Sequence, residues 1–426
     1  MKILKKSKTI SRKRAVILFL LMAGLYAVSF FQRVAVPGTI FNDLQKEFAV
    51  GAGAITVLSS IYLFIYAGQQ FFLGILADKF GGIRLTVISG IILCLGAVLF
   101  PLSHSLWALY LSRALIGLGA GAMFLSGIKE IDNMVKAKNF APLVGVFCVI
   151  GYGGGLLGTR PFRAMVDAMG WREALMAVAI FSVILLFITF LVGFNVQTKK
   201  EEISKKTAIN NIKLILSNGR AYPLLIAVMI NFSLYFSIQS TIGLKFLCDF
   251  LKMETDKAAD YTFVMMLFTL MTMLVSGMIS RKMGNKRKPF LVFCSVNSLS
   301  AVILLLCGVF FKLPALCFML AYVMLAVSAG FAPVTISFMK EINHKDAAGL
   351  SVGTQNTATY LSVAISTGLI GLILDMFKSK TIITATGINI YPPIAYITVF
   401  CLMLIFAIIS VITALKTKET NGKNIH

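Results

Sequence analysis

Apolar residues dominate this chain in runs long enough to cross a membrane. A spanning helix needs about 20 predominantly apolar residues, and twelve stretches of the sequence come close to or exceed that length. They cover residues 15–37, 53–76, 84–101, 105–128, 140–160, 173–194, 221–247, 259–279, 289–311, 314–339, 348–374 and 391–415. The pattern predicts an all-α membrane protein with twelve transmembrane helices.

The longest polar stretch, residues 195–220, separates the first six runs from the last six. We therefore expect an N-terminal six-helix bundle over 1–194, a cytoplasmic linker over 195–220 and a C-terminal six-helix bundle over 221–426. The two halves repeat, because "GILADKFGGIR" (74–84) aligns without gaps with "GMISRKMGNKR" (277–287) and "KEI" at 129–131 recurs at 340–342. Internal symmetry of this kind is typical of secondary transporters, whose solute site lies between the repeats near the midplane.

Composition and charge agree with a membrane protein. The chain is 58% hydrophobic and only 13% charged, whereas a soluble domain has about 25% charged residues. Its formal net charge of +23 comes from Lys and Arg in short loops, which points to a membrane rather than to nucleic acid.

The Lys and Arg residues predict the orientation. Of the 40, 28 fall in segments on the side of the N-terminus, ten fall on the other side and two lie within spans. The positive-inside rule then places both termini in the cytoplasm of a multi-pass protein, most simply in a bacterial inner membrane. A cleaved signal peptide is the alternative for the first run, but no small-residue cleavage site stands out.

Cysteine and histidine give no sign of redox or metal chemistry. The seven cysteines lie mostly inside apolar runs without a C-x-x-C pair, and none of the three histidines lies within a span. We expect neither a disulfide, a metal nor a cofactor. A membrane enzyme would need a metal or an acid–base cluster at membrane depth, and the sequence offers none, so we expect that the protein is not an enzyme. We also expect it to be a monomer.

Two arginines, Arg33 and Arg113, lie within apolar runs, where a guanidinium is costly. The nearest acidic residues, Asp43, Glu130, Asp249 and Asp375, are expected at helix ends or in loops. A pump for cationic drugs would need a buried carboxylate, whereas a positive cavity favours an anion. For Arg33 the alternatives are pairing with backbone carbonyls or snorkelling past Pro37. Arg113 could couple to protons or solute, or snorkel outward.

Polar residues at helical spacing mark the helix faces that turn away from lipid. They form stripes in the first, second, fifth, seventh and eleventh runs. The candidate solute-binding residues are Tyr26, Ser29, Arg33, Tyr62, Tyr66, Gln69, Arg113, Tyr152, Asn231, Tyr235, Gln239, Gln355 and Asn356. For any single tyrosine or glutamine, packing between helices is an equally good explanation.

The segment from Gly74 to Arg84 resembles the G-x-L-A-D-[RK]-x-G-x-[RK] signature of the major facilitator superfamily. The Arg113-x-x-x-Gly117-x-Gly119-x-Gly121 run is similar to the arginine–glycine motif of its fourth helix. The resemblance covers the whole chain and implies two pseudo-symmetric six-helix bundles around a central cavity.

The same resemblance implies a charge cluster of Asp78, Arg84 and Glu130 that locks the cytoplasmic side. A solvated turn with a positive-inside bias is the alternative. The second copy has Arg281 where the first has Asp78, so the lock is expected to be asymmetric. The candidate gating residues are Gly74, Asp78, Gly81, Arg84, Glu130, Arg281, Arg287 and Glu341.

Together these features predict a secondary transporter that moves a small polar, anionic solute by alternating access, with coupling to protons left open. Arg33 resembles the first-helix arginine of the superfamily's organic-anion and organophosphate carriers. The phosphate antiporters among them add an arginine in the seventh helix, where this chain has Gln239 and Lys245, and this difference favours a carboxylate over a phosphate. The rival hypotheses are an efflux pump for neutral drugs and a transporter-like solute sensor.

Overall fold

The computed structural model describes residues 11–134, 137–194, 214–215, 217–344, 348–385 and 387–425. Helices make up nearly all of the described chain. The long ones are α1 (Arg12–Ala35), α3 (Ala52–Phe80), α4 (Gly82–Leu102), α5 (Leu106–Met134), α6 (Ala137–Leu157), α8 (Trp171–Gly193), α10 (Ala221–Ser237), α12 (Thr255–Lys282), α13 (Lys288–Phe310), α14 (Ala315–Gly330), α16 (Ala348–Met376) and α17 (Pro393–Lys416). The shorter elements are η1 (Gly38–Ile40), α2 (Phe41–Phe48), α7 (Arg160–Met169), the π-helical turn η2 (Ile238–Ile242), α11 (Gly243–Leu251), α15 (Ala332–Ile342), η4 (Lys378–Lys380) and strands β1 (Ile382–Ile383) and β2 (Asn389–Ile390).

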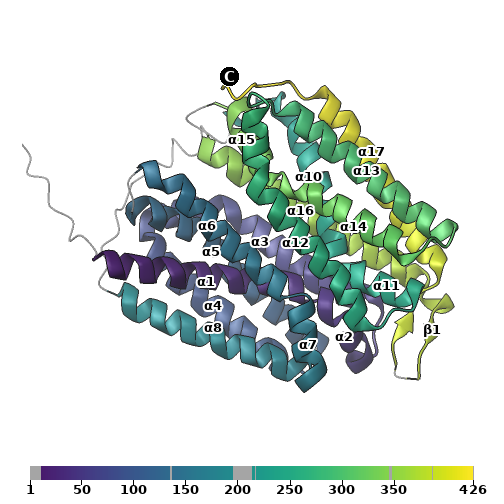
Figure 1. Cartoon of the computed structure of the whole chain (residues 1–426). Helices are drawn as coiled ribbons and strands as arrows, with labels where there is room; N and C mark the ends of the chain where they lie inside the picture. Colours follow the sequence, from purple (N-terminus) through teal and green to yellow (C-terminus); the bar gives the residue numbers. More distant parts are fainter. Residues whose placement is uncertain are drawn as a thin grey trace, which may run out of the picture.

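The predicted fold class is confirmed. In the described part of the chain, eleven helices are long and apolar enough to cross a membrane, or up to twelve if a pair bent by 41°, Leu143–Leu157 and Arg160–Met169, counts as one span. Helices α1–α8 group together, and α10–α17 form a second group beside them (Figure 1). We call these the first and the second bundle. The domain boundaries expected at 194 and 221 stay a prediction, since most of 195–220 is outside the described residues.

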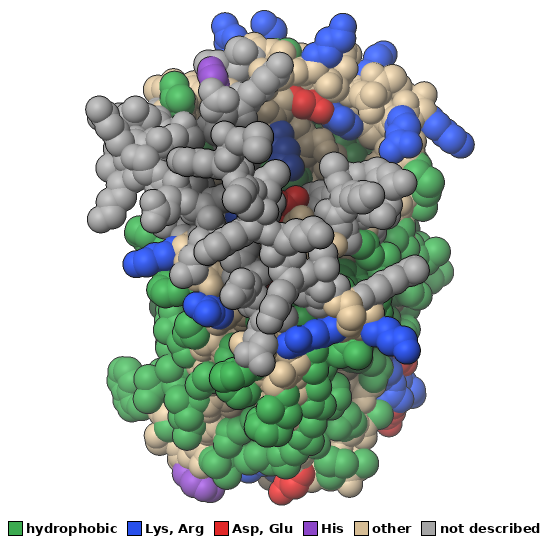
Figure 2. Space-filling model, turned by 90° about the vertical axis from the view of Figure 1, so that its left-hand side faces the viewer, with side chains coloured by type: hydrophobic (Ala, Val, Ile, Leu, Met, Phe, Trp, Pro, Cys, Tyr) green, Lys and Arg blue, Asp and Glu red, His purple; other side chains and the backbone are tan. Residues whose placement is uncertain are grey.

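The two ends of the molecule differ. One end holds the starts of α1, α10 and α13, the turn between α3 and α4, and the C-terminal tail; we call it the termini end. The opposite end holds α2, α7, the start of α3 and the antiparallel β1–β2 hairpin, and we call it the hairpin end (Figure 1). Lys and Arg side chains gather at the rim of the termini end, mostly over the second bundle (Figure 2).

Local sequence explains where several helices stop. Val36 is extended, as expected for a residue before proline, and it ends α1 ahead of Pro37. Gly81 and Gly170 have φ values of +82° and +91°, which only glycine adopts readily, and each separates two consecutive helices. These turns bring α4 back along α3 and α8 back along α7.

Packing between the helices places the site. In the first bundle α5 packs on both α3 and α4, and α1 packs on α6. Between the bundles the most extensive packing is of α3 on α16, and α12 contacts α6 and α7. The α3–α16 contact brings the polar stripes of the second and eleventh predicted spans together.

Candidate functional site

Arg33 lies in the last turn of α1 and is buried, with 1% of its surface exposed. Its Nη1 donates a hydrogen bond to Tyr360 Oη of α16, 2.6 Å away. The guanidinium carbon is 4.5 Å from the centre of the Phe30 ring, 4.3 Å from Tyr66 and 4.7 Å from Tyr360. The cation therefore sits between the bundles in a cage of aromatic rings, whose faces attract it.

The cage leaves the guanidinium incompletely bonded. Nε and Nη2 of Arg33 are buried and have no hydrogen-bond partner, and no described carboxylate forms an ion pair with it. Burying an unpaired donor of a charged group costs at least about 1–3 kcal/mol. Two free, desolvated donors on one planar cation are an arrangement that a bidentate anion would satisfy.

Arg113 of α5 is also fully buried, but its donors are used. Nε donates to the carbonyl oxygen of Leu58 at 3.2 Å, Nη1 to that of Gln32 at 2.8 Å and Nη2 to that of Val36 at 3.0 Å. Its guanidinium carbon lies 4.5 Å from the Tyr62 ring centre. Arg113 thus joins α1, α3 and α5 through backbone carbonyls, and it does not snorkel to the surface.

A cavity of about 70 Å³ lies between α6 and the second bundle, on the termini side of Tyr360. Four of the predicted solute-binding residues line it, together with several polar residues that were not among those candidates. The predicted ones are Tyr152, Asn231, Gln355 and Asn356, and the others include Ser328, Thr335, Thr359 and Tyr360. Arg33 is not part of the lining, but Tyr360 contacts both Arg33 and the cavity.

One lining side chain, the amide of Gln355, has unused hydrogen-bonding capacity. Gln355 Nε2 donates to Thr335 Oγ1 at a long 3.4 Å, while its Oε1 is buried without a partner. Asn231 is fully engaged, donating to Ser295 Oγ and accepting from Ser410 Oγ. The cavity therefore offers a free amide oxygen at one side and the Tyr360 hydroxyl at its inner end.

The other predicted solute-binding residues are occupied by contacts within their own bundle. In the first bundle, Tyr26 stacks on Phe147, Ser29 donates to the Tyr26 carbonyl, Tyr62 donates to the Ser29 carbonyl and Gln69 donates to the Gly117 carbonyl. In the second, Tyr235 contacts Met266 Sδ, and Gln239 donates to the Thr262 carbonyl while its Oε1 stays unpartnered. Among the predicted residues, Tyr66 belongs to the cage through its ring on Arg33, and Tyr62 borders the cage, with its ring centre 5.9 Å from the guanidinium carbon.

The sequence analysis missed Phe30 and Tyr360 as members of the cage. Phe30 was hidden because it is apolar, and Tyr360 because it lies one position beside the eleventh-span stripe that contains Thr359. Helix spacing alone could not show that Tyr360 points toward Arg33 of the other bundle.

The predicted gating residues of the first bundle are only partly visible. The surroundings of Gly74 and the side chain of Asp78 are outside what the structure describes. Glu130 is buried and accepts hydrogen bonds from the backbone N–H groups of Gly82 and Ile83 at the start of α4. Arg84 is exposed and has no ion pair with Glu130. In this conformation Glu130 acts as a cap for α4, and the expected three-charge cluster stays a prediction.

The second bundle uses different residues for its ion pair and for its helix cap at the termini end. Arg287 Nη2 forms an ion pair with Glu341 at 2.8 Å, while Arg281 is exposed. The cap at the start of α13 comes from the C-terminal tail, where Glu419 accepts from the backbone N–H of Arg287 and of Lys288, each at 2.9 Å. The sequence analysis did not single out Glu419, because a cap from so far along the chain leaves no local pattern.

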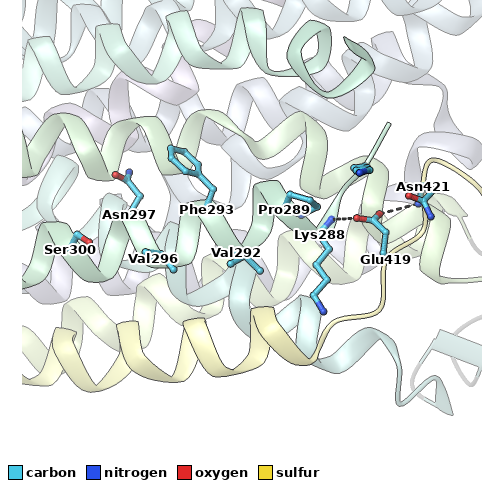
Figure 3. A pocket seen from close by; sticks show the side chains of 10 residues that line it. Lys288, Pro289, Val292, Phe293, Val296, Asn297, Ser300, Glu419 and Asn421 are labelled. Atoms are coloured by element: carbon cyan, nitrogen blue, oxygen red, sulfur yellow. Dashed lines mark hydrogen bonds between the residues drawn. The ribbon is translucent and has the colours of Figure 1, made fainter. Parts of the chain in front are cut away.

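The tail also borders an open groove of about 800 Å³, which runs along the outer face of α13 from Lys288 to Ser300 (Figure 3). Val292, Phe293 and Val296 line its length. This groove faces away from the first bundle, so it is not part of a path between the bundles.

Two helical bundles with a small cavity at their contact are the arrangement expected of a secondary membrane transporter. The family model described as Major Facilitator Superfamily matches residues 18–367. The chain belongs to the major facilitator superfamily, whose members are transporters and not enzymes. The resemblance inferred from the Gly74–Arg84 motif is thereby confirmed.

Solved structures show the same fold at low sequence identity. A bacterial homologue of the human lysosomal transporter Spinster, inward-facing and unoccupied, aligns with a TM-score of 0.78 and 14% identity over 96% of this chain and 98% of that one. A point mutant of the nucleoside transporter NupG aligns with a TM-score of 0.72 and 17% identity over 93% and 98%.

The relatives found by sequence are named for different solutes. The multidrug resistance protein Stp of Mycobacterium tuberculosis is 26% identical over 41% of this chain and 33% of its own length. The probable sulfoacetate transporter SauU of Cupriavidus necator is 23% identical over 44% and 43%, and the nitrite extrusion protein of Bacillus subtilis is 23% identical over 66% and 70%. The alignment spans less than half the length of the first two.

Proposed function

We propose that this transporter moves a small anionic solute by alternating access, and that Arg33 supplies the cation that binds it. The observation that carries the proposal is the buried guanidinium with two unpartnered donors and no paired carboxylate among the described residues. A permanent structural arginine would have its donors satisfied, as those of Arg113 are.

The surroundings support an anion over a cation. Besides apolar side chains, the lining of the cavity beside Tyr360 carries amide, hydroxyl and phenol groups, and none of its residues is acidic. A cation would meet the positive charge of Arg33 without a compensating carboxylate. The sulfoacetate and nitrite named in two relatives are anions, which fits the same chemistry.

The Tyr360 hydroxyl offers a route for the solute to reach Arg33. Tyr360 Oη now accepts from Arg33 Nη1 and lines the cavity at the same time. An anion entering the cavity would take over this bond, and rotation of Tyr360 would open the cage. The position of the Tyr360 side chain would then differ between the solute-free and the solute-bound state of Arg33.

The test begins with a thermal-shift screen of the purified protein against carboxylates, sulfonates, nitrite, phosphates, amino acids, nucleosides and neutral drugs. Each stabilising compound is then measured for affinity in wild type, Arg33→Gln and Arg33→Lys, with the exposed Lys282→Gln as control. Loss of a charge-assisted hydrogen bond costs about 1.5–3 kcal/mol, which is roughly ten- to a hundredfold in affinity. Arg33→Gln should lose this much, and Arg33→Lys should retain part of the affinity because the charge survives.

The control variant should bind like wild type. An anion affinity that is unchanged in a folded Arg33→Gln variant would contradict the proposal, as would a screen in which only neutral drugs bind. The latter result would favour a carrier of neutral compounds, such as an efflux pump, instead.

A further inference from the structure

Helix α3 begins at the hairpin end with backbone donors that its own sequence cannot satisfy. The first N–H groups of any helix lack partners within it, and the residue before α3 is Gly51, which has no side chain to cap them. In the structure, the N–H of Ala52 donates to Tyr391 Oη at 2.6 Å, and the N–H of Gly53 donates to Asp375 Oδ1 at 3.1 Å. Both acceptors belong to the second bundle, so α3 is capped across the bundle boundary.

The glycines of "GAG" (51–53) make room for this cap. A Cβ on Gly51 would lie 2.5 Å from Asp375 Oδ1, and one on Gly53 would lie 2.0 Å from Oδ2. Any larger residue would push the carboxylate away. A carboxylate near the first turn is also favoured by the partial positive charge at a helix N-terminus.

A buried ion pair holds Tyr391 in position. Lys245 Nζ lies 2.7 Å from Asp249 Oδ1 and is fully buried. Asp249 Oδ2 accepts from the backbone N–H of Tyr391 at 3.1 Å and from Tyr396 Oη at 2.6 Å. Lys245 also donates to the carbonyl oxygen of Asn389. These bonds fix the segment 389–391 to the second bundle, and from there Tyr391 contacts the start of α3 in the first bundle.

Other contacts at the same end join the bundles. Asn389 Nδ2 donates to the Val50 carbonyl at 3.0 Å, and Arg160 of α7 pairs with Asp260 of α12 at 3.0 Å. The ion pair is more than a third exposed on both side chains, so it contributes little to stability. The bonds to the start of α3, of which that of Ala52 is buried and that of Gly53 partly buried, contribute more to holding the two bundles together at this end.

We infer that Asp375 and Tyr391 are positioning residues of the transport cycle, which stabilise the state closed at the hairpin end by capping α3 from the opposite bundle. When the bundles separate at this end, both acceptors withdraw and two α3 donors must find water. The Lys245–Asp249 pair supports the cap by holding Tyr391. This inference rests on the alternating access proposed above, but it is independent of the solute.

The experiment measures which end of the full-length purified protein is open. One reporter is Ser59→Cys, at the buried contact of α3 with Thr241 near the hairpin end. The other is Thr335→Cys, which lines the cavity toward the termini end. Maleimide labelling rates are compared with the parent that carries only the seven native cysteines.

Tyr391→Phe and Asp375→Ala should each raise labelling of Ser59→Cys and lower labelling of Thr335→Cys, by about fivefold for a typical cap. Asp249→Asn should act in the same direction as Tyr391→Phe. Tyr110→Phe is the matched control, because it removes a hydroxyl that donates to Ala54 of α3 from within the first bundle. It should leave both rates unchanged.

The opposite movement of the two reporters separates a shift in conformation from general loosening, which would raise both rates. Unchanged rates at both reporters in folded Tyr391→Phe and Asp375→Ala would overturn the inference, and so would a rise at both. If Asp375→Ala does not fold, Asp375→Asn and Tyr391→Phe still decide the matter. Labelling needs no solute, so a failed Arg33 test would leave this result standing.

Discussion

Two buried arginines illustrate how the same residue type takes different roles at the residue scale. The sequence shows that Arg33 and Arg113 both lie inside apolar runs. It does not show which of them meets backbone carbonyls, because those carbonyls come from neighbouring helices and depend on packing. Only the structure separates a bonded arginine from one with two free donors.

The distinction predicts different stabilities for their variants. Arg113→Gln removes a cation that donates to three carbonyls, on Leu58, Gln32 and Val36. Those of Gln32 and Val36 are at the end of α1, and buried acceptors that lose their donor there cost about 1–3 kcal/mol each. Arg33→Gln removes a single bond and two unpaired donors. We expect Arg113→Gln to lower the unfolding temperature in detergent clearly, and Arg33→Gln to lower it less or not at all.

The comparison is made on proteins purified in one detergent, with the exposed Lys282→Gln as reference. Equal losses for the two arginine variants would show that Arg33 is as structural as Arg113.

At the scale of elements, the runs of apolar residues predicted where spans lie but not how they break. The predicted span 221–247 is divided into α10, a π-helical turn and α11, and the span 314–339 is divided at Gly330 into α14 and α15. A Cβ at Gly330 would lie 2.4 Å from Thr272 Cβ of α12. Such breaks are imposed by neighbouring helices, so periodicity within the span does not reveal them.

The C-terminal tail carries a helix cap, Glu419, whose effect on stability we expect to depend on pH. Burial raises the pKa of Glu419, but hydrogen bonds from the backbone N–H groups of Asn421, Arg287, Lys288 and Thr420 outweigh it, so the pKa lies below its ordinary value of 4.5. A depressed carboxyl pKa means that ionisation stabilises the fold. This stabilisation is complete above pH 4.5 and is lost as the pH falls through the lower folded value.

We therefore expect Glu419→Gln to lower the unfolding temperature at pH 7, and the difference from wild type to shrink in strongly acidic buffer. Lys423→Gln, a change at an exposed position of the same tail, is the control and should match wild type throughout. A difference between Glu419→Gln and wild type that is constant with pH would argue against an ionised cap.

At the scale of the whole molecule, the internal repeat and the Gly74–Arg84 motif predicted the class of protein, and the family match confirms it. The contacts between the two bundles could not be predicted from the sequence. The acceptors for Ala52 and Gly53 come from residues more than 300 positions away in the chain, and no local pattern links them. The gating residues that the sequence motif predicts are at the termini end, whereas the caps of α3 by Asp375 and Tyr391 lie at the hairpin end.

Orientation in the membrane is the property of the whole chain that the charges predict most directly. With 28 of the 40 Lys and Arg residues on the side of the N-terminus, the termini end should face the cytoplasm. Single cysteines at Ser204, in the linker, and at Lys282, at the end of α12, should then resist an impermeant maleimide in intact cells. Cysteines at Ser105, between α4 and α5, and at Lys380, in η4, should react.

The Ser204 and Ser105 reporters test the linker and the first bundle, and the Lys282 and Lys380 reporters test the second bundle. Permeabilised cells, in which all four positions should react, supply the control for reactivity, and the parent with its native cysteines supplies the background. Labelling of Ser204→Cys or Lys282→Cys from outside intact cells would invert the topology. It would then place the Asp375–Tyr391 cap on the cytoplasmic side, without changing the argument that this cap holds the two bundles together.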